Sequence, residues 1–385
     1  MSVELGQTLE QRLARRNSDG RYRRRLLIDG RRGAEIVVAG RCLVNFCSND
    51  YLGLADHPQV IQALAQGAAI YGVGSGASHL VCGHFRPHDA LERELAEFTG
   101  RERVLVFSTG YQANLGVIAA LAGRGDLVLE DRLNHASLLD GAKIAGCRLK
   151  RYPHCNHQAL AALLEESQAR FIATDGVFSM DGDLAPLPEL AMIAARHKCW
   201  LYVDDAHGFG VLGQRGAGTL EHFGLGQKEV PILMATFGKA LGVFGAFVAG
   251  GEEVIETLIQ EARTYIYTTA LPPALAQAVL TSLRLVQKEA WRRERLKELI
   301  ERFRLGAKAL GLPLLPSETP IQPLVVGDSQ KAVELSRKLM DKGFWVAAIR
   351  PPTVPSGSAR LRITLTCAHS LDQVDGLLQA LERSL

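Results

Sequence analysis

A lysine at the end of an apolar, strand-like run is the residue most able to carry chemistry in this sequence. Lys239 follows the run within Ile232–Gly242, and Gly238 and Gly242 lie on either side of it. Glycine lets the backbone approach a ligand closely. Partial burial or a neighbouring cation lowers the pKa of a lysine amine, which can then form a Schiff base with an aldehyde. A threonine-x-glycine-lysine sequence alone is more often a surface lysine after a strand.

A second polar cluster lies about thirty residues upstream and favours the functional interpretation. The segment Tyr202–Gly208 places Asp204 and His207 directly after the apolar run Cys199–Val203. In largely parallel sheets, ligands bind at the carboxyl ends of the strands. The residues expected to converge at such an edge are Ser108, Asp175, Asp204, His207, Thr236 and Lys239.

Alternating strand and helix patterns predict the sheet that would bring these residues together. Strands are expected at 104–107, 127–129, 170–175, 199–203 and 232–236, and helices after Pro58, around Leu91–Phe98, after Gly110, after Asn134 and over 190–196. Strands separated by helices imply right-handed crossovers and a mainly parallel sheet. The turn Ser108–Asn114 opens a helix, and helix N-termini attract anions.

One glycine pattern suggests a different function. Gly208–Gly213 matches the G-x-G-x-x-G fingerprint of a dinucleotide-binding fold. The residues Gln214–Gly218 cannot continue a good helix, and no acidic residue ends a following strand at the expected distance. The aspartate pair before the pattern has no role in that scheme, so a nicotinamide enzyme is not favoured.

Composition indicates a cytoplasmic globular protein of two domains sharing a cleft. The 385 residues are 47% hydrophobic and 22% charged, with a net charge of +3. No apolar run approaches the roughly 18 residues of a membrane span, and no signal core precedes Leu13. The seven scattered cysteines include no C-x-x-C, which favours free thiols. His154–His157 resembles a metal cluster but is interpreted as a loop, so no metal is predicted.

The two ends of the chain differ in sequence pattern from the middle. The first forty residues are rich in arginine and form either a solvated face or a docking surface for an anionic partner. A short helix capped by Thr8 is expected there. A long helix from Ala274 toward Arg304 precedes a small α+β region with strands at 322–326, 345–349 and 360–365 and helices at 331–340 and 371–381. The expected division is a basic N-terminal segment over 1–45, a large α/β domain over 46–273, and a connecting helix with a small α+β domain over 274–385.

Several motifs together resemble the α-oxoamine synthases. They are Ser48–Gly53, Ser108–Tyr111, Asp175–Asp183, Asp204–Gly208 and Thr236–Lys239. The resemblance spans nearly the whole chain. It implies the aspartate-aminotransferase-like α/β fold (fold type I), with a large mainly parallel sheet domain and a small α+β C-terminal domain. It also implies pyridoxal 5′-phosphate as cofactor.

The resemblance assigns roles residue by residue. Lys239 would hold the cofactor and move the substrate α-proton, and Asp204 would pair with the pyridine nitrogen. His207 and Ser179 would contact the ring, and Gly110, Tyr111 and Thr236 the phosphate. His135 would stack on the ring and contact substrate. Arg362 would bind the amino-acid carboxylate, with Thr353 and Arg23 as further substrate contacts; Arg21 and Arg24 compete with Arg23.

The resemblance also implies a reaction. Ile349–Pro355 and the arginine-rich start are most similar to family members that condense L-alanine with a pimeloyl thioester, releasing CO2 and the thiol. The acyl group would be carried by coenzyme A or by an acyl carrier protein, and the enzyme would be a homodimer with shared sites. A glycine- or serine-using relative is the first alternative. A non-catalytic subunit of the same fold is the second.

Overall fold

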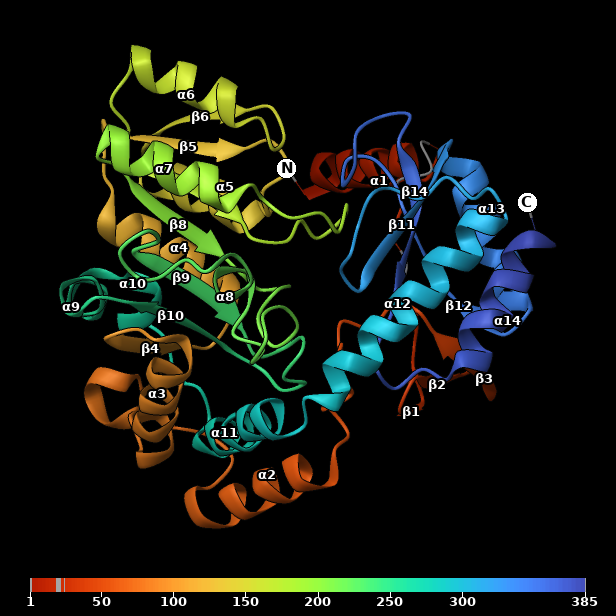
Figure 1. Ribbon diagram of the computed structural model, residues 1–385, viewed down its shortest axis with the longest axis horizontal. Coiled ribbons are helices and arrows are strands. Elements are labelled where there is room, and N and C mark those ends of the chain that lie inside the picture. Colours follow the sequence, from red (N-terminus) through yellow and green to blue (C-terminus); the bar gives the residue numbers. More distant parts are fainter. Residues whose placement is uncertain (1, 19–21, 24, 385) are drawn as a thin grey trace. The chain divides into compact units, whose positions relative to one another are not determined.

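The computed structural model describes residues 2–18, 22–23 and 25–384, with only the backbone considered for residues 2–7. Arg21 and Arg24, the alternatives to Arg23, lie outside these residues. The described chain forms two compact units (Figure 1). The first unit comprises the chain up to Ser48, Met180–Gly182 and the chain from Leu296 onward. The second comprises Asn49–Ser179 and Asp183–Arg295.

A seven-stranded sheet forms the centre of the second unit (Figure 1). The strand order is β4 (Arg103–Phe107), β10 (Ala246–Gly250), β9 (Ile232–Thr236), β8 (Trp200–Asp204), β7 (Phe171–Asp175), β5 (Leu127–Asp131) and β6 (Arg148–Tyr152). β6, β5, β7, β8 and β9 run parallel, and β10 is antiparallel to both of its neighbours. The mainly parallel sheet is therefore confirmed, whereas β10 was not predicted.

Helices connect and cover these strands. They are α2 (Pro58–Tyr71), α3 (Arg86–Thr99), α4 (Gly110–Leu121), α5 (Ala136–Ile144), α6 (His157–Glu166), α7 (Leu187–His197), α8 (Thr219–Phe223), α9 (Glu252–Glu261), α10 (Arg263–Ile266), α11 (Pro273–Lys288) and the π-helical turn η1 (His79–Gly83). The local sequence explains their ends. Pro58 occupies the first turn of α2, Gly100 ends α3 in the left-handed conformation, and Thr109 caps α4 by accepting from the Gln112 amide.

The core of this unit packs α4, α5, α9 and α10 against the sheet. Strand side chains such as Phe107, Phe171 and Val248 are buried with helix side chains such as Val117 and Leu258. α4 contributes residues to this core along its whole length. Its packing therefore fixes the start of α4 relative to the strand ends.

The first unit contains two small sheets. The strands β1 (Gly30–Arg32), β2 (Glu35–Val38), β3 (Arg41–Asn45) and β12 (Phe344–Trp345) form one, and β11 (Ile321–Gly327), β14 (Ala359–Thr364) and β13 (Ala347–Ile349) form the other. Its helices are α1 (Ser2–Ser18), α12 (Trp291–Ala309, which begins in the second unit), α13 (Ser329–Asp341) and α14 (Leu371–Glu382). The mixed strands and helices have the α+β character expected of the C-terminal region.

Two local predictions were wrong. Thr8 does not cap a helix, because α1 already begins at Ser2. The strand expected at 345–349 is divided, because Trp345 pairs with β3 in one sheet and Ala347 pairs with β14 in the other. The predicted domain limits, 45/46 and 273/274, remain a prediction; the two compact units are divided after Ser48 and after Arg295.

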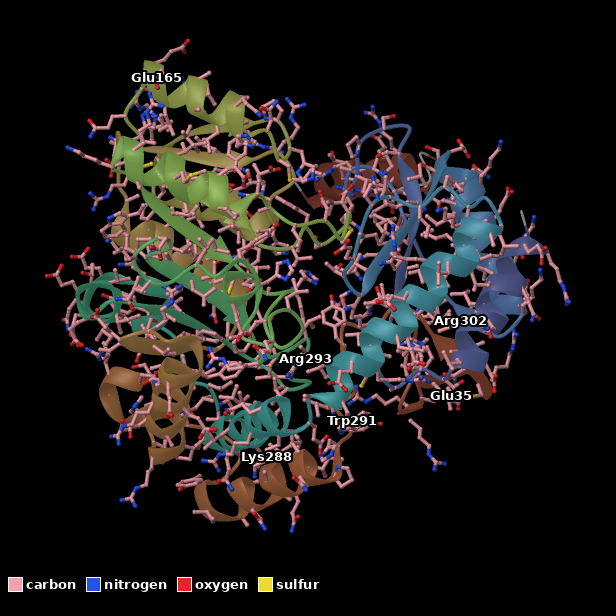
Figure 2. The ribbon with its side chains drawn as sticks, viewed as in Figure 1. Glu35, Glu165, Lys288, Trp291, Arg293 and Arg302 are labelled. Carbon is pink, nitrogen blue, oxygen red and sulfur yellow. The ribbon has the colours of Figure 1, made fainter. Side chains whose placement is uncertain are left out.

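The single long helix expected from Ala274 is two helices. α11 ends at Lys288 and α12 begins at Trp291, with Glu289 outside helical geometry. The Val286 carbonyl oxygen accepts a bond from the Arg293 guanidinium at 2.7 Å (Arg293 and Lys288 are labelled in Figure 2). The Arg293 side chain thereby donates to a carbonyl of the last turn of α11 that would otherwise lack a partner. The helix can therefore end there and the chain can change direction.

No described helix combines the length and the apolar character that crossing a membrane requires.

Candidate active site

A cavity of about 190 Å³ in the second unit is lined from the carboxyl ends of β7, β8 and β9 and from the starts of α4 and α5. Every residue predicted to be catalytic or to bind the cofactor lines it: Gly110, Tyr111, His135, Ser179, Asp204, His207, Thr236 and Lys239. Five further residues complete the lining, namely Asn114, Ser137, Asp175, Ala206 and Met234. The structure therefore brings together segments that lie up to 129 residues apart between Gly110 and Lys239.

Lys239 lies in a tight loop between two strands. The loop is closed by bonds from the Phe237 amide to the Gly245 carbonyl and from the Val243 amide to the Phe237 carbonyl, both 2.9 Å long. Phe237 itself is fully buried. The loop therefore fixes a half-buried lysine at the end of β9.

Asp204 is buried at the end of β8 and is held at both carboxylate oxygens. Its Oδ2 accepts from the Asn114 side-chain amide at 2.7 Å, and its Oδ1 accepts from the Ala206 backbone amide at 3.0 Å. Asp204 pairs in register with Asp175 at the end of β7. Burial, together with the nearby Asp204 charge, raises the pKa of Asp175 well above its usual range. The two carboxyl groups end adjacent strands, so a charge on one of them opposes ionisation of the other.

His135 and His207 both line the cavity. The His135 backbone amide donates to Asp175 Oδ2 at 2.8 Å, which fixes the start of α5. Desolvation lowers the pKa of His135, partly offset by Asp204. His207 Nδ1 lies 2.6 Å from the Tyr51 hydroxyl. Tyr51 belongs to the Ser48–Gly53 motif, to which no specific role was assigned from the sequence.

The start of α4 forms a cradle suited to an anion. The first amides of a helix lack intrahelical partners and, with the helix dipole, favour a negative charge. Among the described residues, the buried Thr236 Oγ1 has no hydrogen-bond partner. A Cβ added at Gly110 would lie 2.6 Å from Thr236 Cγ2 and fill the cradle. These features fit the phosphate of the cofactor that the family resemblance implies.

Some predicted site residues do not line this cavity. Ser108, expected at the sheet edge, instead donates to the Thr269 carbonyl at 3.3 Å and is not among the lining residues. Arg23, Thr353 and Arg362 belong to the first unit. There, Arg23 and Thr353 are exposed, and the buried Arg362 donates to Thr364 Oγ1 at 2.9 Å.

Asn114 and Ser137 are the lining residues that the sequence reasoning missed. Asn114 stands at the end of the turn Ser108–Asn114, and Ser137 follows Asn134, after which a helix was expected. A helix that starts at the strand ends places the side chains of its first two turns near the site. The position of each residue in its helix was the signal available.

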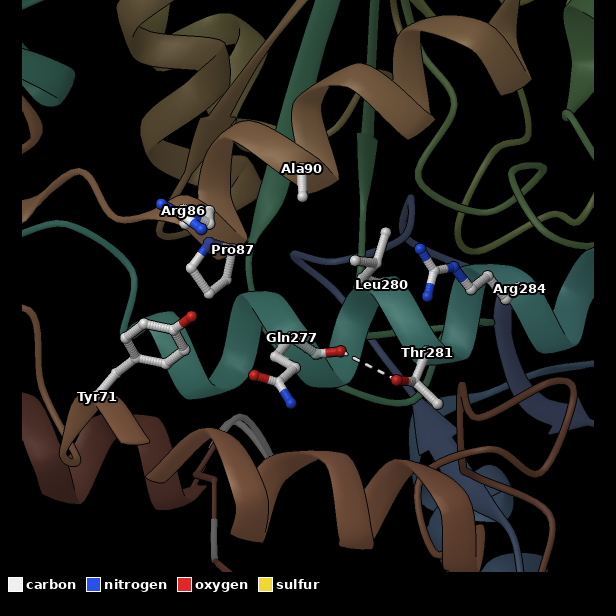
Figure 3. Close-up of a pocket in the computed structure, with 8 residues that line it drawn as sticks. All are labelled: Tyr71, Arg86, Pro87, Ala90, Gln277, Leu280, Thr281 and Arg284. Atoms are coloured by element: carbon white, nitrogen blue, oxygen red, sulfur yellow. Dashed lines mark hydrogen bonds between the residues drawn. The ribbon is translucent and has the colours of Figure 1, made fainter. Parts of the chain in front are cut away.

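A second hollow, of about 290 Å³, lies between α2, α3 and α11 (Figure 3). Its polar lining includes Tyr71, Gln277 and Thr281, and the Thr281 hydroxyl donates to the Gln277 carbonyl. Arg284 at its edge is paired with Glu94 at 2.9 Å. This hollow is larger than the first, but it lacks the lysine, aspartate and histidine groups that could perform chemistry.

Two clusters elsewhere contain metal-binding types of side chain. His79, His84 and His88 lie together, but His88 accepts from the Phe85 amide and contacts the Leu271 carbonyl, so both of its nitrogens are engaged. His154 lies between Asp131 at 2.9 Å and Asp183 at 2.7 Å. Asn156 caps α6, so this segment is a loop before a helix, as predicted.

Known proteins resemble this chain over nearly its whole length. The family model described as aminotransferase class I and II matches residues 41–381. The 8-amino-7-oxononanoate synthase of Methylococcus capsulatus is 63% identical over 362 residues, with 94% of each chain covered. The synthase of Thioalkalivibrio sulfidiphilus is 60% identical, covering 98% of this chain and 97% of its own.

Solved structures give the same picture for the fold. Sphingomonas wittichii serine palmitoyltransferase has a TM-score of 0.92 at 31% identity, covering 99% of this chain and 97% of its own. The 8-amino-7-oxononanoate synthase of Francisella tularensis has a TM-score of 0.79 at 33% identity, covering 89% and 97%. A serine palmitoyltransferase from S. paucimobilis, with a TM-score of 0.92 at 29% identity over 98% and 96%, was solved with a bound PLP–myriocin aldimine.

These similarities confirm the aspartate-aminotransferase-like fold that the motifs implied. Since the relatives at about 60% identity match along nearly the entire chain, the chain belongs to the class I and II aminotransferase family and, within it, to the 8-amino-7-oxononanoate synthases.

Proposed function

We propose that this enzyme uses pyridoxal 5′-phosphate to condense L-alanine with a pimeloyl thioester, giving 8-amino-7-oxononanoate, CO2 and the free thiol, in biotin biosynthesis. The observation that carries the proposal is the convergence of Lys239, Asp204 and His207 on one cavity that has an anion cradle at the start of α4. The names of the relatives at 58–63% identity support the substrates.

The bound cofactor supplies an aldehyde for amino groups and a ring that withdraws electrons from the substrate α-carbon. Lys239 holds the aldehyde through its amine and then takes and returns the α-proton of alanine. Asp204 keeps the pyridine nitrogen protonated. Asp204 suits this task because it is a buried carboxyl group that accepts hydrogen bonds from the Asn114 side chain and the Ala206 amide.

The remaining cavity residues bind and orient. His207, which Tyr51 positions, and Ser179 would hold the ring of the cofactor, and His135 would hold the ring and contact substrate; all three line the cavity. Gly110, Tyr111 and Thr236 hold the phosphate at the start of α4. Arg362 binds the carboxylate of alanine through its planar guanidinium. Thr353 and Arg23 bind the acyl substrate.

Two other functions remain as alternatives. A glycine- or serine-using relative has the same fold, as the serine palmitoyltransferases at about 30% identity illustrate. The higher identity to the 8-amino-7-oxononanoate synthases favours alanine. A non-catalytic subunit would not need the lysine, yet Lys239 is present with the other site residues around it.

Replacing Lys239 by Ala should separate cofactor attachment from cofactor binding. The variant should still bind pyridoxal phosphate through the α4 cradle and Asp204, but lose it on dialysis. Exchange of the α-hydrogen of alanine with solvent should slow by about 10²–10⁴-fold, the usual contribution of a positioned base. Proton NMR in D2O measures this exchange.

Borohydride should fix the cofactor onto Lys239 of the unmodified enzyme, as peptide mass spectrometry would detect. The exposed Lys228→Ala serves as control and should behave like the unmodified enzyme. Labelling of another lysine, or undiminished exchange in the Lys239 variant, would show that a different residue acts as the base.

The substrates can be tested by pairing amino acids with thioesters. Alanine with a pimeloyl thioester should turn over far faster than glycine with acetyl or succinyl thioester, or serine with palmitoyl thioester. We expect a preference of at least about 10²-fold in kcat/KM, because a mismatched acyl chain or side chain loses several contacts. Comparable rates with glycine would assign the chain to another branch of the family.

We also propose a cytoplasmic homodimer. None of the seven cysteines, all of which lie among the described residues, forms a disulfide, which agrees with a reducing compartment. Large apolar side chains are exposed around the glycine-rich loop Gly72–Ser78, which follows α2. The exposed fraction is 68% for Ile70, 88% for Val73 and 78% for Val81. Such exposure over neighbouring segments is typical of a protein interface, and a second copy of the chain is the proposed occupant.

Light scattering tests the dimer. The enzyme should have twice the chain mass of 41.9 kDa. The double variant Ile70→Asp and Val81→Asp should dissociate toward the single-chain mass, because charges in an apolar interface are costly. Ile144→Asp, at an exposed position of α5, should leave the mass unchanged. A single-chain mass for the unmodified enzyme would disprove the dimer.

The basic helix α1 is the proposed docking surface for an acyl carrier protein. Arg12, Arg15 and Arg16 are exposed on it, and acyl carrier proteins are acidic. Arg15→Ser with Arg16→Ser should raise KM for the protein-borne thioester several-fold at low salt and spare the coenzyme A thioester, since such attraction is screened by salt.

The matched control for the basic helix is Lys331→Ser with Arg337→Ser, two exposed cations on α13. This control should change neither KM. Equal effects of the α1 variant on both donors, or no effect at all, would leave α1 as a solvated helix.

A further inference from the structure

The Asn114 side chain connects two residues of the proposed site. It is buried in α4 and its amide nitrogen donates to Asp204 Oδ2 and to Ser137 Oγ, both at 2.7 Å. Its amide oxygen accepts from the Tyr202 hydroxyl. The opposite amide orientation would place its oxygen against the Asp204 carboxylate, where two acceptors repel. The orientation of Asn114 is therefore fixed by its partners.

The direction of the next bond follows from this orientation. The Ser137 hydroxyl accepts from Asn114, so its own hydrogen is available for His135 Nδ1, which lies 2.7 Å away. The Ser137 backbone amide also donates to His135 Nδ1, at 3.3 Å. An imidazole nitrogen that receives hydrogen bonds from two donors carries no proton of its own. In the neutral ring the proton is therefore on Nε2.

We propose that Asn114 is a positioning residue that holds the Asp204 carboxylate and, through the Ser137 hydroxyl, fixes His135 as the tautomer protonated on Nε2. This chain of hydrogen bonds starts at Tyr202 in the core and ends at the cavity. It makes His135 a hydrogen-bond donor toward substrate, suited to a carboxylate or thioester carbonyl oxygen, and not a general base. The role toward substrate rests on the proposed function, whereas the tautomer does not.

The charges around His135 agree with a neutral ring. Desolvation lowers its pKa, and Lys239 acts in the same direction. Asp204 and Asp140 act in the opposite direction, and Asp175 accepts from the backbone amide of His135. A second proton, on Nδ1, would also point at the Ser137 backbone amide, so the geometry opposes the imidazolium independently of these charges.

Nitrogen-15 NMR of the histidine-labelled holoenzyme, without substrates, tests the inference. His135→Gln identifies the resonances of His135 by their loss. In the unmodified enzyme, neutral His135 should be protonated on Nε2 alone. A proton on Nδ1, or an imidazolium at neutral pH, would overturn the inference without involving any variant, and would leave the substrate assay untouched.

Ser137→Ala tests the link to Asn114. Removing the hydroxyl should raise the pKa of His135 by about half a unit to one unit, the shift that corresponds to one net hydrogen bond, and should mix the tautomers. Ser282→Ala is the matched control, because Ser282 is equally buried and its hydroxyl bonds only the Leu241 carbonyl among the contacts described. The control should change neither property. Equal spectra for the two variants would overturn the link.

Asn114→Leu tests the link to Asp204. With one of the two Asp204 bonds and the Ser137 bond lost, the Kd for pyridoxal phosphate should rise by about tenfold, as absorbance titration of the apoenzyme would measure. His135 should also lose its single tautomer. A native circular dichroism spectrum with unchanged Kd and unchanged tautomer would show that Asn114 only fills space.

Discussion

Two buried carboxyl groups lie side by side at the carboxyl edge of the central sheet, and each is held by its own hydrogen-bond donors. Asp175 and Asp204 end adjacent parallel strands in direct register. Two buried like charges at this separation repel strongly. Burial and the neighbouring carboxyl raise the pKa of Asp175, while the Asn114 side chain and the Ala206 backbone amide donate hydrogen bonds to Asp204. Asp175 then uses one oxygen to fix the start of α5.

The next acid along the chain has an entirely structural position. Asp205 accepts from the Thr219 amide at 2.8 Å, and burial raises its pKa to about 7. A Cβ at Gly208 or Gly218 would collide with its carboxylate. The glycine pattern that matches a dinucleotide fingerprint therefore makes room for an acid, and no helix of normal length follows it. Of the two consecutive aspartates, Asp204 therefore lines the cavity, whereas Asp205 holds the start of α8.

Much of the fold was predictable because its signals are local. Apolar runs followed by polar turns gave the strands ending at Asp175, Asp204 and Thr236, and the parallel order brought those ends together. β10 escaped prediction because antiparallel insertion depends on pairing with distant strands. The break after α11 depends on the Arg293 side chain, which donates to the Val286 carbonyl in place of a backbone amide. Helix propensities of single residues do not predict such a contact. The helix starts indicated that Asn114 and Ser137 lie near the site, but their roles depend on hydrogen-bond directions that the sequence does not encode.

The loop before α6 shows how a histidine can lose its usual character. Burial alone would lower the pKa of His154, but the carboxylates of Asp131 and Asp183 raise it to about 12. Its ring also packs edge-on against Phe178, beside Ser179 of the cavity. The folded pKa exceeds the unfolded one, so its stabilising contribution is complete below the unfolded value and disappears only as the pH rises toward 12. Over the range in which living cells operate, His154 is a fixed cation, comparable to a short arginine rather than to a sensor of acidity.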